Sequence, residues 1–155
     1  MITEDAQEFA AALPAVGGLL ALDLGTKTIG IATSDPNRRI SSPVKTLKRT
    51  KFQANTLELQ GLIDERKTAG LVLGLPINMD GSSGPRAQSS RTFGRNLTNA
   101  LGLPVLLWDE RLSTAAMERE LISLDTSRRR RAEMIDAMAA NFILQGVLDR
   151  LANCR

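Results

Sequence analysis

Apolar and polar positions follow one another along this chain with the periods of strands and helices. Short continuous apolar runs such as "LLALDL" (19–24) and "GLVLGLP" (70–76) are typical of buried strands. Segments with apolar residues three and four positions apart are typical of helices that bury one face. The pattern predicts strands over 19–24, 28–35, 40–47, 70–76 and 104–110, and helices over 52–67, 85–101, 113–124 and 131–151.

The order of these elements predicts the fold class. Three strands come first, and helices and strands then alternate, which indicates an α/β domain with a mixed five-stranded sheet. An antiparallel three-strand meander would be extended by parallel strands, with helices on both faces. Pro43 interrupts the third strand, which therefore belongs at an edge.

The N-terminal segment differs in composition from the rest. Residues 1–16 carry Glu4, Asp5 and Glu8 but no Lys or Arg, which is the wrong charge for a secretion signal. The apolar stretch 9–22 is too short to span a bilayer. A lone cysteine, Cys154, excludes an internal disulfide. We expect a flexible tail over 1–16, a single domain over 17–152, a cytoplasmic location and no membrane partner.

Charge is distributed unevenly along the chain. All 20 Lys and Arg lie at or after Lys27, while three of the 17 Asp and Glu lie in the tail, so the remainder carries 20 basic against 14 acidic residues, a net charge of +6. Such a surface suits a polyanion, although a slightly basic enzyme would show the same excess. With four Phe, one Trp and no Tyr, the chain has few platforms for stacking bases. A nucleic acid would be bound mainly through its phosphates.

Three sets of carboxylates lie on apolar elements. Asp23 shares one strand face with Leu19 and Ala21, and Asp136 falls inside the apolar arc of the last helix. Asp109 and Glu110 end an apolar strand, at the sheet edge where α/β proteins place their sites. Each acid alone has a structural explanation, such as a turn cap or an ion pair. Brought together, they would repel one another unless cations lay between them, and Mg²⁺ prefers such oxygen ligands.

The absence of histidine restricts the chemistry. With no His in the sequence, a zinc site with His ligands and a Ser-His-Asp triad are both excluded. Water activated by a divalent metal, Mg²⁺ or Mn²⁺, remains as a route to hydrolysis of a phosphodiester.

Four segments carry a family resemblance: "LDLGTKTIGIATSD" (22–35), "GLPINMDGSSGPRA" (74–87), "DERLST" (109–114) and "DAMAANFIL" (136–144). In this order they resemble the bacterial family of Holliday-junction-resolvase-like proteins, also described as pre-16S rRNA nucleases. The family is similar to RuvC-type resolvases within the ribonuclease H-like fold. The resemblance covers roughly residues 18–150 and implies that Asp23, Glu110 and Asp136 are the catalytic, metal-binding carboxylates. The choice of Glu110 over Asp109 rests on the resemblance.

Several other side chains are candidates for contacts with nucleic acid. Lys27 follows the first strand, where it could reach a phosphate or serve as an ordinary turn lysine. Arg111 could contact the scissile phosphate or pair with a neighbouring acid. The remaining candidates are Asn78, Ser83 and Arg86 around the start of a helix, which is a favourable place for an anion, and Arg128, Arg129 and Arg130 in a basic run.

The leading hypothesis is a Mg²⁺-dependent nuclease that processes the 5′ end of pre-16S rRNA, with pre-rRNA or branched DNA as its partner. A Holliday junction resolvase and a non-catalytic RNA-binding ribosome-assembly factor are the alternatives. The "DLGT" segment also resembles the phosphate loop of actin-like ATPases and sugar kinases, but those folds close two such domains around a nucleotide. The sequence leaves the oligomeric state open, a homodimer included.

Overall fold

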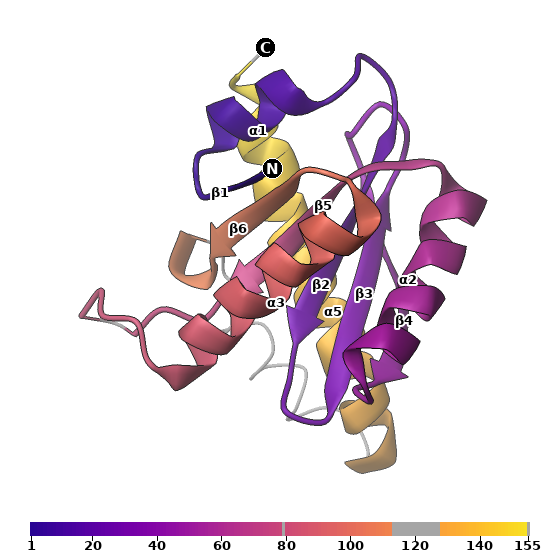
Figure 1. The fold of residues 1–155 in the computed structure, drawn as a ribbon, viewed down its shortest axis with the longest axis vertical. Coiled ribbons are helices and arrows are strands. Elements are labelled where there is room, and N and C mark those ends of the chain that lie inside the picture. The colour runs from indigo at the N-terminus through magenta and orange to yellow at the C-terminus, as the bar shows by residue number, and fades with distance from the viewer. Residues whose placement is uncertain (79, 113–127, 155) are drawn as a thin grey trace.

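The computed structural model describes residues 1–78, 80–112 and 128–154, with side-chain detail in the last range from residue 136. A mixed sheet lies at its centre, with the strand order β1-β6-β5-β2-β3-β4 (Figure 1). β2, β3 and β4 are antiparallel neighbours, and β5, β6 and β1 extend the sheet in parallel from β2. The strands are β1 (Ile2–Thr3), β2 (Gly18–Leu24), β3 (Thr28–Ser34), β4 (Ser41–Lys48), β5 (Thr68–Leu75) and β6 (Val105–Asp109).

Helices cover both faces of the sheet. In Figure 1, α2 and α3 lie in front of the sheet and α5 passes behind it. Within the described ranges, none of the helices has a stretch both long and apolar enough for a membrane crossing. The helices are α1 (Ala6–Ala12), α2 (Phe52–Arg66), α3 (Pro85–Leu101), the short 3₁₀ helix η1 (Glu110–Leu112) and α5 (Arg128–Ala152).

Alternation along β2 divides the interior into two cores. Leu20 and Leu22 point to the core beneath α2 and α3, while Leu19 and Ala21 point to the core beneath α1 and α5. Because side chains of a strand point to opposite faces in turn, a strand buried on both sides must be apolar throughout. Asp23, on the α5 side, is the exception.

The predicted architecture is confirmed in its main features. The three-strand meander, the parallel strands and the helices on both faces are present, and β4 lies at an edge of the sheet. Pro43 pairs next to a register shift between Ile31 and Ala32, where a missing ladder hydrogen bond is tolerated. The helix predicted over 113–124 lies outside the described residues.

The N-terminal segment differs from the expectation of a loose tail over residues 1–16. β1 pairs with β6 and makes the sheet six-stranded rather than five-stranded. Asp5 caps α1 by accepting hydrogen bonds from the backbone N–H groups of Gln7 and Glu8, and Phe9 is fully buried against α5 and the sheet. Asp5 followed three positions later by Glu8 is a helix-start pattern, which the acidic composition of the segment obscured.

The first prediction concerns this segment. Replacing Phe9, which is 0% exposed, by Ala should lower the free energy of unfolding by about 3–5 kcal/mol, because a large side chain leaves a cavity between α1, α5 and the sheet. Denaturant unfolding measures the change. Val16→Ala is the control, since this side chain is 64% exposed and should change the stability by less than about 0.5 kcal/mol. Equal stability of the two variants would contradict the packed N-terminus.

Candidate active site at the end of the central strands

Asp23 occupies the penultimate position of β2 and is 4% exposed. Its register partner on β3 is Gly30. On the other side, β5 runs parallel to β2, and Gly74 follows the paired residue Leu73 as Asp23 follows Leu22. Both neighbours of Asp23 in the sheet thus lack a side chain. A charged group is costly to bury without compensation, so the space above these glycines must be filled by groups suited to a carboxylate.

Asp136 reaches this place from α5. A Cβ atom on Gly30 would overlap the carbonyl oxygen of Asp136, so the helix backbone rests directly on β3. The hydroxyl of Thr28 donates a hydrogen bond to Oδ2 of the Asp136 carboxylate. The backbone contact brings Asp136 beside the register partner of Asp23, and the Thr28 hydrogen bond fixes the direction of its carboxylate.

Glu110 reaches the same corner from β6. It begins η1, directly after the strand ends at Asp109. A Cβ atom on Gly74 would lie 2.7 Å from Oε1 of Glu110 and 2.8 Å from Cδ1 of Ile143 on α5. The carboxylate of Glu110 therefore lies over Gly74, on the face of the sheet that also bears Asp23.

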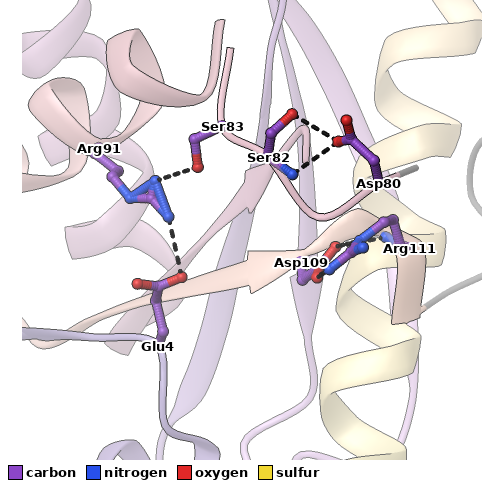
Figure 2. Close-up of polar contacts among 7 residues, drawn as sticks. All are labelled: Glu4, Asp80, Ser82, Ser83, Arg91, Asp109 and Arg111. Carbon is purple, nitrogen blue, oxygen red and sulfur yellow. Dashed lines mark hydrogen bonds and ion pairs between the residues drawn. The ribbon is translucent and has the colours of Figure 1, made fainter. Parts of the chain in front are cut away.

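The neighbouring acid Asp109 is engaged elsewhere. Its carboxylate accepts hydrogen bonds from the backbone N–H of Arg111 at 2.9 Å and from Nη2 of the same residue at 2.7 Å (Figure 2). These hydrogen bonds hold the pKa of Asp109 below its ordinary value of 3.8, and the same ion pair raises the pKa of Arg111. Asp109 is thus paired with Arg111, whereas the carboxylate of Glu110 lies over Gly74.

The three acids thus belong to β2, η1 and α5, and each lies beside Gly30 or Gly74 near one end of the central strands. Carboxylate oxygens are the donors that Mg²⁺ and Mn²⁺ prefer, so the chemistry of the set fits such an ion. Across the residues that the structure describes, however, no three His, Cys, Asp or Glu side chains are grouped closely enough to hold a metal. The hydrogen bond from Thr28 directs one Asp136 oxygen toward β3. The role of Asp23, Glu110 and Asp136 as metal ligands stays a prediction.

Two predicted phosphate contacts lie around the end of β2. Lys27 is exposed in the turn between β2 and β3. Arg86 is exposed in the first turn of α3 and donates from Nη2 to the carbonyl of Leu24 at 3.4 Å. Leu24 directly follows Asp23, so the structure brings the Arg86 cation and the proposed catalytic strand together.

The other predicted contacts have partners within the protein or lie outside the described side chains. Asn78 donates from Nδ2 to Oγ of Ser82 at 3.0 Å. Figure 2 shows Ser83, whose hydroxyl accepts a hydrogen bond from Arg91 at 3.2 Å. Arg111 pairs with Asp109, which was the structural alternative for this residue. Arg128, Arg129 and Arg130 form the start of α5, but their side chains lie outside the described part.

Sequence reasoning missed the glycines on which the site is built. Gly30 and Gly74 lie inside strands, where glycine weakens packing and often marks a close approach of another backbone or a ligand. That signal was available in "TIGIATS" and "LVLGLP". Thr28 carried no comparable signal, because its partner Asp136 is 108 positions away in the sequence.

Comparison with known proteins gives a consistent family. The family model described as RuvX, Holliday junction resolvase, matches residues 17–150. A protein of Cereibacter sphaeroides strain KD131, named "Putative pre-16S rRNA nuclease", is 60% identical over 97% of this chain and 94% of its own length. A protein of Bradyrhizobium sp. strain BTAi1 with the same name is 62% identical over 96% of this chain and 92% of its own length.

Solved structures share the fold at low sequence identity. Thermus thermophilus RuvC superposes with a TM-score of 0.52 at 10% identity, over 87% of this chain and 96% of that chain. The yeast mitochondrial Holliday junction resolvase Ydc2 superposes with a TM-score of 0.51 at 14% identity, over 96% of this chain and 85% of that chain. The predicted ribonuclease H-like, RuvC-type fold is therefore confirmed.

The second prediction concerns the contact between α5 and the sheet. Gly30→Ala should lower the free energy of unfolding by about 3 kcal/mol, because the added methyl overlaps a backbone carbonyl that can yield only if the helix moves. Gly61→Ala is the matched control: nothing lies within 4 Å of its added methyl, and a helix-interior Gly→Ala change should raise stability by about 0.5–1 kcal/mol. A Gly30 variant as stable as the wild type would contradict the close contact.

The third prediction concerns pH. A lowered pKa in the folded state means that Asp109 contributes stability above its unfolded pKa, and that this stability is lost as pH falls through the folded pKa. Arg111→Gln should raise the pKa of Asp109 toward its ordinary value and reduce stability near neutral pH, with the difference from wild type shrinking in acid. Carboxyl ¹³C NMR titration and unfolding at several pH values measure both effects. Arg95→Gln, an exposed arginine on α3, should leave the Asp109 titration unchanged.

Proposed function

This chain belongs to the RuvX Holliday junction resolvase family, and on that premise we propose that it is a divalent-metal-dependent nuclease that processes the 5′ end of pre-16S rRNA. The observation that supports the proposal is the position of three acids beside two strand glycines: Asp23 pairs with Gly30, the backbone of Asp136 lies on Gly30, and Glu110 lies over Gly74. These acids come from three separate elements, and the neighbouring strands provide no side chains there.

Ribosomal RNA is the favoured substrate because of the relatives' names. Proteins about 60% identical over nearly the whole chain are named as pre-16S rRNA nucleases. Branched DNA is the alternative within the same chemistry, and it is supported by the description of the family. Both substrates are polyanions, and both suit the excess of basic residues after residue 16. Processing of rRNA would place the protein in the cytoplasm.

Asp23, Glu110 and Asp136 would hold the Mg²⁺ or Mn²⁺ ion. When bound, such an ion supplies a nucleophile at neutral pH and stabilises charge on the leaving oxygen. Asp23 is fixed by a buried central strand, and sites on rigid elements hold their geometry well. Thr28 orients Asp136 through the hydrogen bond to Oδ2. Ile143 lies beside Glu110 over Gly74 and contributes an apolar wall.

Basic and polar side chains around this corner would hold the strand by its phosphates. Lys27 and Arg86 lie at the end of β2, and Arg111 lies beside Glu110 in η1. Arg128, Arg129 and Arg130 precede Asp136 on the same helix by about two turns. Asn78 and Ser83 belong to the loop before α3 and would contact the backbone only after exchanging their present hydrogen bonds.

The fourth prediction tests catalysis directly. Asp23→Asn, Glu110→Gln and Asp136→Asn should each reduce Mg²⁺-dependent cleavage of a pre-16S rRNA fragment by more than about 100-fold, the upper range for loss of a residue that merely supports a metal ligand. RNA binding should persist. The metal-free variants should be as stable as the wild type or more so, because each substitution removes a charge from a cluster of like charges.

Asp149→Asn supplies the control for these variants, since it removes an exposed carboxylate from the far end of the same helix and should leave cleavage unchanged. Undiminished cleavage in the three site variants would reject the metal site. A wild-type protein that binds the fragment but cleaves neither it nor a four-way DNA junction would favour the non-catalytic assembly factor. Preference for the junction would instead favour the resolvase.

A further inference from the structure

A small pocket lies between the turn that follows β2 and the first turns of α3. Its volume is about 170 Å³, and its polar wall is formed by Thr26, Arg49, Arg86, Ser89 and Ser90. Sites for drug-sized ligands measure about 300–1,000 Å³, so this pocket is too small for a nucleoside and suits a compact group. It opens beside Leu24 and Gly25, the residues that directly follow Asp23.

Two guanidinium groups face this pocket without a carboxylate. Arg49 donates from Nη1 to the carbonyl of Gly25 at 2.8 Å, and Arg86 donates from Nη2 to the carbonyl of Leu24 at 3.4 Å. Among the described residues, the side-chain ion pairs join Arg91 to Glu4 and Arg111 to Asp109, so neither pocket arginine takes part in one. Carbonyl acceptors position these cations but leave both charges uncompensated.

The guanidinium of Arg49 lies over the ring of Phe93, which in turn packs against Phe52. The guanidinium carbon lies 5.6 Å from the ring centroid of Phe93, which meets Phe52 edge-on at 5.4 Å. A cation over an aromatic face is attracted by the ring, and Phe93 is itself buried in the core. The Arg49 side chain is therefore positioned before any ligand binds.

Ser90 adds a hydroxyl to the wall of the pocket. The residue lines the pocket and is 2% exposed. A serine hydroxyl can donate a hydrogen bond to a bound anion. The start of α3 also favours a bound anion. Its N-cap, Gly84, provides no side-chain hydrogen bond, and no acidic residue lies in its first turn to offset the positive end of the helix dipole.

We propose that Arg49, Arg86 and Ser90 form a phosphate-binding pocket for a non-scissile phosphodiester of the nucleic-acid strand that the nuclease cleaves. The assignment rests on the proposed function for the strand, but the pocket's preference for a phosphate follows from its own charges and size. Asp23 and Leu24 are consecutive and point to opposite faces of β2. A phosphate bound here would place the strand over the end of β2, with a neighbouring phosphate near the three acids.

The fifth prediction uses the salt dependence of binding. The full-length protein is titrated with a labelled RNA hairpin carrying a single-stranded 5′ extension, in EDTA, between 50 and 200 mM salt. Arg49→Gln and Arg86→Gln should each reduce the slope of log K against log salt by roughly 0.7–0.9, the share of one phosphate contact. Arg66→Gln, which removes an exposed charge from the far end of α2, is the matched control. Slopes equal to that of Arg66→Gln would overturn the proposal.

Two further variants, Ser90→Ala and Arg49→Lys, test whether misfolding explains a loss of RNA binding. Ser90→Ala places the residue with the highest helix propensity inside α3, so its Tm should equal or exceed that of the wild type. Its RNA affinity should nevertheless fall about tenfold, the effect of one hydrogen bond to a charged group, with the salt slope unchanged. Arg49→Lys keeps the charge and should keep the slope. Wild-type affinity in Ser90→Ala would overturn its role in binding the phosphate.

Titration with inorganic phosphate tests whether the pocket binds a phosphate of the nucleic-acid strand or a free phosphate compound. If phosphate raises the Tm of the wild type but not of an Arg49→Gln, Arg86→Gln double variant, while all variants bind the hairpin equally, the pocket serves a free phosphate compound and the strand proposal is overturned. Failure of the nuclease proposal would look different. Cleavage would be absent, or insensitive to Asp23→Asn, while the salt slopes of the pocket variants still differed from the control.

Discussion

A direct contact between two backbones sets the distance between α5 and the sheet. α5 rests on Gly30 so closely that a single methyl group there would overlap the Asp136 carbonyl. Every other residue type would hold the helix further from the sheet, and Asp136 would move away from Asp23. Gly74 plays the corresponding part for Glu110 and Ile143. Glycine lowers the stability of a strand, and at these two positions it provides the space that the Asp136 backbone and the Glu110 side chain occupy.

Adjacent acidic residues at this end of the sheet have different surroundings. Asp109 and Glu110 are adjacent in the sequence, yet Arg111 takes up the charge of Asp109 at 2.7 Å and leaves Glu110 over the glycine. On the opposite face of β2, the carbonyls of Leu24 and Gly25 hold Arg86 and Arg49. Negative charge therefore gathers on one face of the strand end and positive charge on the other. A polyanion that crosses the end of β2 would meet both, and the cations would offset its repulsion by the acids.

The N-terminal segment shows how composition can mislead. Its acids suggested a solvated tail, but Asp5 serves as a helix cap and Phe9 is buried between α1, α5 and the sheet. The N-terminal ammonium of Met1 also donates to Oγ1 of Thr98 on α3 at 2.8 Å. These contacts cover the outer edge of β6, the strand that leads to Glu110. An exposed sheet edge is a liability in folded proteins, and β1 covers Val105 and Leu106 so that a strand of only two residues forms the edge.

The sequence by itself determined the order of the strands and helices from β2 to β6, the edge position of β4 and the faces on which Asp23 and Asp136 lie, because strand alternation and helix periodicity are local properties. The family motifs also named the three acids. Only the tertiary structure decided that Asp109 pairs with Arg111, that β1 and α1 pack against the sheet and α5, and that Arg49 and Ser90 share a pocket. These outcomes depend on register and on contacts between distant residues, such as Thr28 and Asp136 at a separation of 108 positions. No local pattern encodes such a contact, because its free energy exists only once the sheet and α5 have packed together.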